Sequence, residues 1–285
     1  MDFWKMNGAG NDFLILDMRG QDIPQARYGV IARSLCERRL SVGADGVMFV
    51  LPAQGEGDFR MRFFNADGSE GEMCGNGARC ICRYGCETGL AGETQRVETA
   101  AGLVTGRRID ARTYRVRLND PTAVELHRSV TVDGRRYDCA YIELGVPHAV
   151  LFMPHLQETP PEALLPLARA LRSHPEFPRG ANVNFYEIIG KDRFFLRTFE
   201  RGVEDFTYAC GTGTGSTALT LALCGLTGTS VDAEMRGGTL HVDVEPDGGT
   251  AKNIFLTGPA AVVAKGTLTE EAFQIAGSAS PMTRQ

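Results

Sequence analysis

Residues 61–77 read Met-Arg-Phe-Phe-Asn-Ala-Asp-Gly-Ser-Glu-Gly-Glu-Met-Cys-Gly-Asn-Gly, and residues 196–213 read Leu-Arg-Thr-Phe-Glu-Arg-Gly-Val-Glu-Asp-Phe-Thr-Tyr-Ala-Cys-Gly-Thr-Gly. In both stretches a strand-like run ends in a polar residue, Asn65 or Glu200, and an acidic loop then leads to Cys-Gly-x-Gly. A helix-like apolar segment follows each motif. Because Cys74 and Cys210 lie almost half a chain length apart, this internal repeat predicts two domains of similar build that arose by duplication.

The rest of the chain is rich in strand-like segments and poor in helices. Helical spacing predicts helices over residues 26–38 and 162–172, and two more helices begin directly after Cys74 and Cys210. Apolar or alternating runs predict strands over residues 13–16, 46–51, 59–64, 114–118, 140–144, 149–152, 184–189, 193–197, 240–244 and 260–264. We therefore expect an α+β fold with an N-terminal half over residues 1–118 that carries Cys74 and a C-terminal half over residues 119–262 that carries Cys210.

The composition is that of an ordinary globular protein. The 285 residues are 43% hydrophobic and 23% charged, with a formal net charge of −5. An acidic chain without a basic face is not expected to bind nucleic acid. The sequence has no apolar run long enough to span a membrane and no apolar signal peptide at its start, so we expect a cytoplasmic protein that does not enter membranes.

The eight cysteines are expected to be reduced thiols, because the chain is long and shows no secretion signal. Four of them cluster at positions 74, 80, 82 and 86, but the spacing contains no C-x-x-C pair and no histidine lies nearby. That pattern fits neither a zinc site nor an iron–sulfur site, and we expect no metal. Cys80, Cys82 and Cys86 are instead expected to be mostly buried side chains of a helix.

A cysteine at the start of a helix has a tunable acidity. The first helical turn presents unpaired N–H groups and the positive end of the helix dipole, which can lower a thiol pKa from about 8.5 to about 3.5–7.5. The glycines of the two motifs, Gly75, Gly77, Gly211 and Gly213, would let backbone amides approach a bound carboxylate closely. If the two domains face each other, one thiolate can remove the α-proton of an amino acid while the other thiol delivers a proton to the opposite face. This arrangement predicts racemisation or epimerisation without a cofactor.

Other interpretations of the two motifs explain less. Each cysteine alone could be a packing residue, and residues 211–215 resemble a phosphate loop without matching its Gly-Lys-Ser/Thr pattern. A thiol oxidoreductase would need C-x-x-C. A thiol hydrolase could use His148, but it would leave the second motif unexplained.

The motifs taken together resemble the diaminopimelate epimerase family. They are Met6-Asn-Gly-Ala-Gly-Asn-Asp-Phe13, Asn65-Ala-Asp-Gly-Ser-Glu70, Cys74-Gly-Asn-Gly-Ala-Arg-Cys80, Pro147-His148, Asn182-Val183, Glu200-Arg-Gly202 and Ala209-Cys-Gly-Thr-Gly213. The resemblance implies that LL-diaminopimelate is converted to meso-diaminopimelate, a precursor of lysine and peptidoglycan, without pyridoxal phosphate. It also implies a homodimer whose subunits have two pseudo-symmetric domains, each a curled, mostly antiparallel sheet around a central helix. Residues 263–285 would then return to the first domain and end in a loose tail from Gly277.

The resemblance also implies roles for individual residues. Cys74 and Cys210 match the base and the acid, and His148 and Glu200 match residues that tune the two thiols. The reacting end of the substrate would be bound by Gly75, Asn76, Gly211 and Thr212. Its remaining polar contacts, mostly at the distal end, would come from Asn11, Asn65, Asn182 and Arg201, with Glu200 also lining the substrate site.

Three positions depart from the family pattern, and the first two of them keep another activity open. Val146 stands before Pro147-His148 where the family often has Asn, Phe206 precedes Thr207 where Glu is common, and Gly46 follows Asp45 where some members have Gln. A racemase of another amino acid, such as histidine or proline, is therefore the alternative activity. The alternative from a different class is a duplicated binding protein with inert cysteines.

Overall fold

The computed structural model describes residues 1–71 and 74–273. Contacts divide the chain into two units, one formed by Met1–Val116 together with the segment from Pro259 onward, the other by Arg117–Gly258. The boundaries between the two units thus follow Val116 and Gly258, whereas the sequence analysis expected them after residues 118 and 262. The second boundary lies before residue 262 because the Ala260 backbone N–H already donates to the Arg112 carbonyl of the first unit, at 2.9 Å. The predicted loose tail from Gly277 lies outside the described residues.

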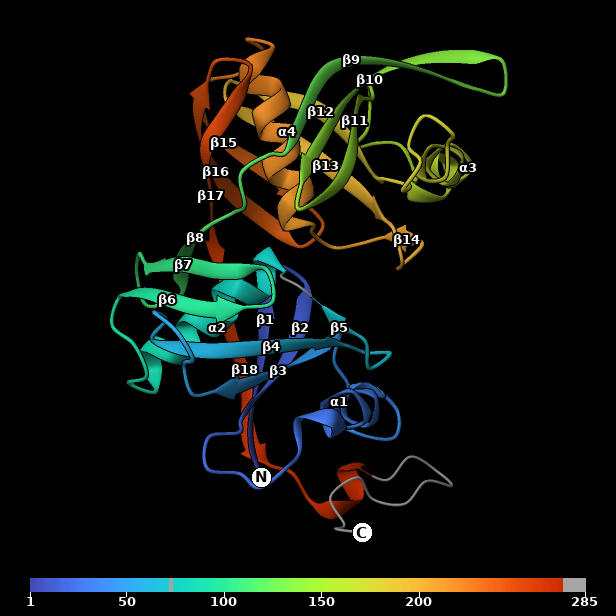
Figure 1. Ribbon diagram of the computed structural model, residues 1–285. Helices are drawn as coiled ribbons and strands as arrows, with labels where there is room; N and C mark the ends of the chain where they lie inside the picture. The colour runs from blue at the N-terminus through green and yellow to red at the C-terminus, as the bar shows by residue number, and fades with distance from the viewer. Residues whose placement is uncertain (72–73, 274–285) are drawn as a thin grey trace. The chain divides into compact units, whose positions relative to one another are not determined.

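The first unit is a sheet wrapped around helix α2 (Gly75–Glu87), with helix α1 (Tyr28–Cys36) on its outer side (Figure 1). Neighbouring strands run antiparallel, except that β2 is parallel to β3 and β4 is parallel to β6. A two-residue strand, β5 (Glu70–Gly71), pairs with β4. In spatial order the main strands are β18 (Ala261–Thr267), β1 (Asp2–Gly8), β2 (Asn11–Asp17), β3 (Gly46–Leu51), β4 (Phe59–Asn65), β6 (Thr94–Thr99), β7 (Gly102–Arg108) and β8 (Thr113–Arg117).

The second unit repeats this plan around helix α4 (Gly211–Leu223), with helix α3 (Pro161–Arg172) on the outside. Again two neighbouring pairs are parallel, β11 with β12 and β13 with β15, and again a two-residue strand, β14 (Asp205–Phe206), pairs with the strand before it. In spatial order the main strands are β9 (Ala123–Val132), β10 (Arg135–Leu144), β11 (Val146–Phe152), β12 (Asn182–Gly190), β13 (Arg193–Glu200), β15 (Ser230–Met235), β16 (Gly238–Asp247) and β17 (Thr250–Pro259).

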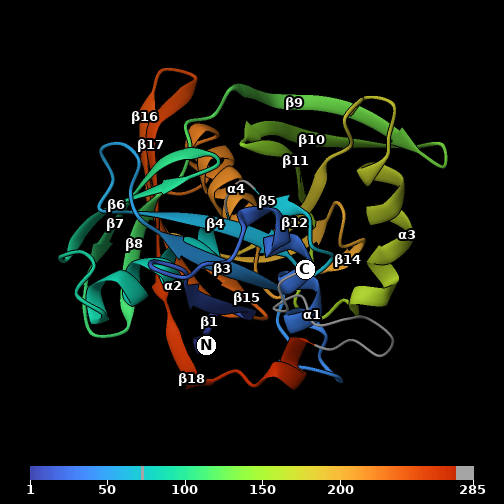
Figure 2. The ribbon, with the colours of Figure 1, turned by 60° about the horizontal axis from the view of Figure 1, so that its bottom comes forward.

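The predicted α+β fold of two similar halves is therefore confirmed. Each strand of one unit has a counterpart in the other, and each central helix packs against strands from both ends of its own sheet: α2 against β1, β2, β6 and β7, and α4 against β10, β11, β12, β15 and β16 (Figure 2). No helix of the described residues is long and apolar enough to cross a membrane.

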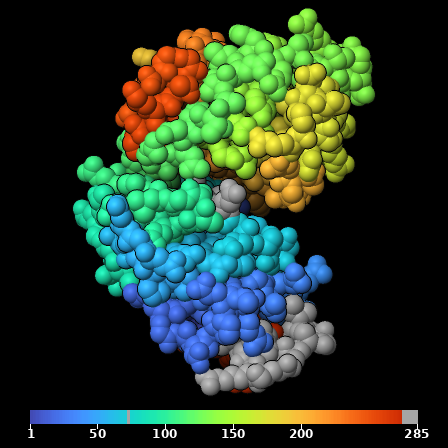
Figure 3. Space-filling view, viewed as in Figure 1, coloured from blue at the N-terminus to red at the C-terminus, as the bar shows by residue number. Residues whose placement is uncertain are grey.

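The burial of the central elements follows from their position between layers. Strand β3 is buried along its whole length, because α1 packs on it and strands lie on both of its edges. Tyr28 of α1 stacks on Phe49 of β3 with ring centroids 4.2 Å apart. Strand β9, in contrast, alternates between exposed and half-buried residues over much of its length, and its hairpin with β10 protrudes from the second unit (Figure 3). An element so exposed carries little apolar signal in its sequence.

Two of the motif glycines have a packing role. A Cβ atom added to Gly77 would lie 2.3 Å from the Met48 Cε atom, and one added to Gly213 would lie 2.3 Å from the Asn184 Oδ1 atom. The absence of a side chain at these two glycines therefore has a packing reason, and the predicted approach of their backbone amides to a carboxylate stays a prediction. They let the first turn of each central helix press against the sheet of its own unit.

Candidate active site

Cys74 occupies the residue before α2, where an extended backbone turns into the helix. Its φ and ψ angles are −123° and 121°, and its carbonyl accepts the Ala78 N–H at 2.7 Å, which closes the first helical turn. The side chain is half-buried, and Gly75 and Asn76 after it are buried. The first amides of α2 have no acceptor within the helix, so the N-terminal end beside Cys74 has donors for an anion.

Asn76 and Asn11 form a direct pair in the first unit. The Asn76 Nδ2 group donates to Asn11 Oδ1 at 2.7 Å, and the Asn11 Nδ2 group donates to Asp45 Oδ2 at 3.2 Å. Asn76 is fully buried, whereas Asn11 is half-buried at the start of β2. The structure thus brings together two predicted substrate-binding residues that lie far apart in the sequence.

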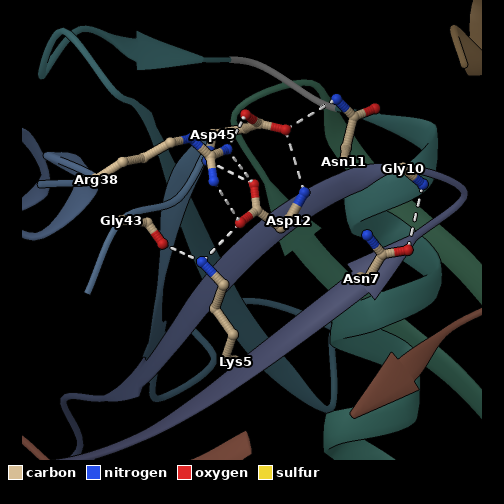
Figure 4. A network of polar contacts seen from close by, with 8 residues as sticks. All are labelled: Lys5, Asn7, Gly10, Asn11, Asp12, Arg38, Gly43 and Asp45. Carbon is tan, nitrogen blue, oxygen red and sulfur yellow. Dashed lines mark hydrogen bonds and ion pairs between the residues drawn. The ribbon is translucent and has the colours of Figure 1, made fainter. Parts of the chain in front are cut away.

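Asn11 is anchored by a network of charged groups (Figure 4). Arg38 binds both Asp12, at 2.6 Å, and Asp45, at 2.7 Å, and the Lys5 ammonium lies 2.6 Å from Asp12. Burial by itself would raise the pKa of Asp12, but its hydrogen bonds with Arg38 and Lys5 outweigh burial and hold that pKa below its ordinary value. The β1–β2 corner is therefore held by charge-assisted bonds, and Asn11 has a fixed amide orientation.

Asn65 ends β4 and lies opposite Gly46 in the pairing with β3. Its Nδ2 group donates to Ser69 Oγ at 3.0 Å, inside the acidic loop that leads toward Cys74. Gly46 has a structural reason at this position, since a Cβ atom there would lie 2.4 Å from the Phe63 ring and 2.7 Å from the Phe64 carbonyl oxygen.

Cys210 repeats the geometry of Cys74 in the second unit. It precedes α4 with φ and ψ of −118° and 112°, and its carbonyl accepts both the N–H and the hydroxyl of Thr214, at 2.9 and 2.7 Å. Its thiol lies 3.7 Å from the Thr212 hydroxyl. Cys210 and Gly211 are buried, and Thr212 is half-buried. Each predicted cysteine therefore directly precedes the central helix of its own unit.

His148 lies buried in β11 and is held by Asn184 of the adjacent strand β12. The Asn184 amide nitrogen donates to the Ala149 carbonyl at 3.1 Å and lies 3.1 Å from His148 Nδ1, while Asn184 Oδ1 accepts the Thr198 hydroxyl at 2.9 Å. These bonds fix the amide orientation, so His148 Nδ1 accepts and the ring proton belongs on Nε2. That Nε2 atom is buried and has no hydrogen-bond partner in the described part of the chain. Burial, assisted by the charge of Arg201, lowers the pKa of His148 to about 3 and keeps the ring neutral.

Asn182, Glu200 and Arg201 meet where β12 and β13 lie next to each other. Asn182 pairs with His148 in the β11–β12 register, and its Oδ1 atom accepts the Arg201 backbone N–H at 2.7 Å. The Glu200 carboxylate accepts the Thr207 hydroxyl, and the Arg201 guanidinium donates to the Arg179 carbonyl at 2.5 Å. The predicted residues of the second unit are thus linked by hydrogen bonds or lie on neighbouring strands.

The model of one protein family, described as diaminopimelate epimerase, matches residues 3–122 and 140–263. The chain belongs to the diaminopimelate epimerase family. The resemblance inferred from the motifs is confirmed, and with it the class of enzyme, an isomerase.

Similar proteins support the assignment to the diaminopimelate epimerase family. A diaminopimelate epimerase of Aquifex aeolicus is 38% identical, with 96% of this chain and 100% of the relative covered. The diaminopimelate epimerase of Archaeoglobus fulgidus is 39% identical, with 93% and 95% covered. Among solved structures, a probable proline racemase from Agrobacterium radiobacter matches with a TM-score of 0.70 at 18% identity, covering 94% of this chain and 92% of that chain. A PhzF-family phenazine biosynthesis protein from Bacillus anthracis matches with a TM-score of 0.71 at 17% identity, covering 94% and 99%. These structures are similar in fold.

Two further positions that depart from the family pattern lie in strands of the second unit. Phe206 packs edge-on against Phe199, with centroids 5.6 Å apart, and near Phe185 at 6.3 Å, so it extends the apolar core of its unit. Val146 begins β11 and pairs with Leu144 across a tight turn at Gly145.

Sequence reasoning missed three residues that support this family's motif residues in the structure: Arg79, Asn184 and Thr198. Arg79 is fully buried and bonds to Asn76, Asn184 lies against His148, and the Thr198 hydroxyl donates to Asn184. A signal did exist for Asn184, because it lies two residues after Asn182 and therefore on the same face of the strand. Arg79 lies inside the Cys74 motif, but nothing local indicates that its charge is buried.

Proposed function

We propose that this protein is a diaminopimelate epimerase that inverts one α-carbon of LL-diaminopimelate to give the meso isomer, using Cys74 and Cys210 and no pyridoxal phosphate. The observation that carries the proposal is the repeated geometry, in which each unit has one cysteine directly before its central helix. Relatives named diaminopimelate epimerase, 33–39% identical over most of the chain, support the substrate.

The proposed reaction moves one proton off the α-carbon and another one on. The substrate carboxylate binds to the first amides of the central helices, at Gly75-Asn76 and Gly211-Thr212. One thiolate removes the α-proton and becomes a thiol, and the electron pair that remains is delocalised into the carboxylate, where the amides stabilise the growing charge. The other thiol gives its proton to the opposite face and becomes the thiolate. The carbon is inverted, and no external acid, base or oxidant is consumed.

The remaining residues tune the thiols and hold the other polar groups of the substrate. We assign tuning to His148, which offers an Nε2–H donor, and to Glu200, whose carboxylate is oriented by Thr207. We assign the distal end to Asn11, Asn65, Asn182 and Arg201, with Glu200 also facing the substrate. A second amino-acid head group requires such donors and acceptors, because buried polar groups without partners are costly.

The racemase of histidine or proline is the weaker alternative. The proline racemase and the hydroxyproline epimerase similar to this chain share only 18% and 19% sequence identity with it, and that level of likeness supports the fold alone. We further propose a cytoplasmic homodimer, in line with the lysine and peptidoglycan precursor role implied by the family, and no nucleic-acid partner, in line with the net charge of −5.

The test is inversion of LL-diaminopimelate in deuterium oxide. We expect deuterium at the α-carbon of the meso product, and a panel with L-histidine and L-proline should show no turnover. Cys74→Ala and Cys210→Ala should each abolish inversion, whereas Cys224→Ala, which removes an exposed thiol after α4, should retain it. Retained inversion in either of the first two variants would refute the two-cysteine mechanism, and turnover of proline or histidine instead would refute the substrate.

A further inference from the structure

Arg79 is a fully buried cation in the second turn of α2. Its guanidinium donates to three oxygen atoms: Asn76 Oδ1 at 2.9 Å, the Gly75 carbonyl at 3.3 Å and the Pro259 carbonyl at 3.3 Å. Two of these acceptors belong to the turn that directly follows Cys74. All three acceptors are neutral, and Arg79 forms no ion pair within residues 1–71 and 74–273. A buried charge is normally paired, because removing an ion from water without a partner is costly.

Among the described residues, the negative charges that would favour the Arg79 cation are those of two thiols. Burial lowers the pKa of Arg79 to about 10, and thiolate charge on Cys80 or Cys74 would raise it again. Arg79 is therefore still a cation at neutral pH. Cys80 is fully buried, and burial raises its pKa to about 12, so it stays protonated. Cys74, which is half-buried, is the other described thiol whose ionisation the Arg79 cation favours.

The other charged side chains that the structure describes on α2 and on the strands packed against it either have partners or are exposed. On the strands that pack against the helix, the pairs are Lys5 with Asp12, Asp17 with Arg19 and Arg96 with Glu56, while Asp2 accepts from Thr267, Glu98 from the amides of residues 54, 55 and 57, and Arg108 contacts Cys86. On α2 itself, Arg83 pairs with Glu87. Arg107 is exposed.

The repeat supplies an internal comparison for Arg79. Arg79 is the fifth residue after Cys74, and the fifth residue after Cys210 is Gly215. A Cβ atom added there would lie 2.8 Å from Leu118, 3.0 Å from Leu144 and 3.3 Å from Ile254. The corresponding place in the second unit is therefore closely packed and apolar, with no room for a cation. The two cysteines share a backbone geometry but differ in the charge that lies behind them.

We propose that Arg79 is a positioning residue that stabilises the thiolate of Cys74, so that the resting protein holds its thiolate on Cys74 and its thiol proton on Cys210. Arg79 acts through Cys74, and its orientation is set by Asn76 and by the Pro259 carbonyl. Asn76 in turn connects through Asn11 to the carboxylate of Asp45. The role of Arg79 in catalysis rests on the proposed function, whereas the preference for a thiolate on Cys74 over one on Cys210 is a property of the protein without substrate.

The experiment measures the pH at which each cysteine becomes reactive. The full-length protein without substrate is alkylated with iodoacetamide between pH 5 and 10, and peptide mass spectrometry gives separate rates for Cys74 and Cys210. In the unmodified protein, we expect the midpoint for Cys74 to lie below that for Cys210. In Arg79→Gln, the Cys74 midpoint should rise by about one pH unit or more, which is about a tenfold slower reaction at neutral pH, because an opposite charge has been removed.

Two matched variants separate charge from packing. Arg79→Lys keeps the cation and should recover most of the Cys74 reactivity. Arg83→Gln removes a cation from the same helix that is already paired with Glu87, and it should leave the Cys74 midpoint unchanged. The Cys210 midpoint should stay constant in all three variants.

Several results would overturn the proposal. One is a folded Arg79→Gln protein, judged by circular dichroism, with an unchanged Cys74 midpoint; another is Arg79→Lys reacting as slowly as Arg79→Gln. A Cys210 midpoint below that of Cys74 in the unmodified protein would also overturn it, and that measurement does not depend on any variant folding. Because alkylation is followed without substrate, a lack of epimerase activity would refute the proposed function and leave this result standing.

Discussion

Neutral, buried His148 makes the second unit sensitive to acid. Its pKa is lowered from the ordinary value of 6.5 to about 3, chiefly by burial and then by the charge of Arg201. Between these two pH values the unfolded chain binds a proton at this position that the folded chain does not bind. Stability therefore rises with pH across the window and is lost as the pH falls from 6.5 toward 3.

The size of this loss of stability follows from the difference between the pKa of His148 in the unfolded chain and its pKa in the folded protein. Each pH unit within the window is worth about 1.4 kcal/mol, so at pH 5 the free energy of unfolding is lower by about 2 kcal/mol than at pH 7.5 because of this one group. His148→Gln cannot titrate. It should be less stable than the unmodified protein at pH 7.5, since it disturbs the bond with Asn184, but it should lose about 2 kcal/mol less on acidification to pH 5.

Urea unfolding at pH 7.5 and pH 5.0 measures this difference. Hydrogen exchange of peptides from β11 and β12 reports on the second unit alone, and the remaining titrating groups are shared by both proteins, so they cancel in the comparison. Equal losses of stability in the two proteins would show that His148 is not neutral and buried as described.

Three further predictions concern the surroundings of His148 and the charged network around Asp12. Asn184→Asp places a carboxylate beside His148 Nδ1 and should raise the His148 pKa by about 1–3 units, visible in the nitrogen shifts of the ring by NMR; an unchanged pKa would contradict the assigned contact. Gly213→Ala puts a methyl group 2.3 Å from Asn184 Oδ1 and should cost about 1–3 kcal/mol of unfolding free energy, partly relieved when Asn184→Ala is added; additive effects of the two changes would refute the clash. Asp12→Asn should cost about 1–3 kcal/mol at pH 7, because it removes charge-assisted bonds with two cations. Since the folded pKa of Asp12 lies below 3.8, this contribution is present above pH 3.8 and lost as the pH falls through the folded value, so urea midpoints of the two proteins should converge in acid.

Local patterns were sufficient to predict much of the fold. The repeat around Cys74 and Cys210 indicated two similar halves. Strands β4 and β13 were predicted because their side chains largely alternate between buried and less buried positions, and β3 because all of its side chains are buried. Strands such as β9 were missed, since most of its side chains are exposed or only half-buried and its identity depends on pairing with β10.

The candidate site shows the same division. The sequence by itself determined that a cysteine precedes each central helix, because a helix start is encoded within a few residues of the motif. Only the tertiary structure decided which distant groups hold Arg79 and His148. Arg79 reaches the Pro259 carbonyl from the far end of the chain, and Asn184 reaches His148 because β11 and β12 pair in parallel. Such contacts depend on which distant segments pack together, and burial then sets the cost of each charge.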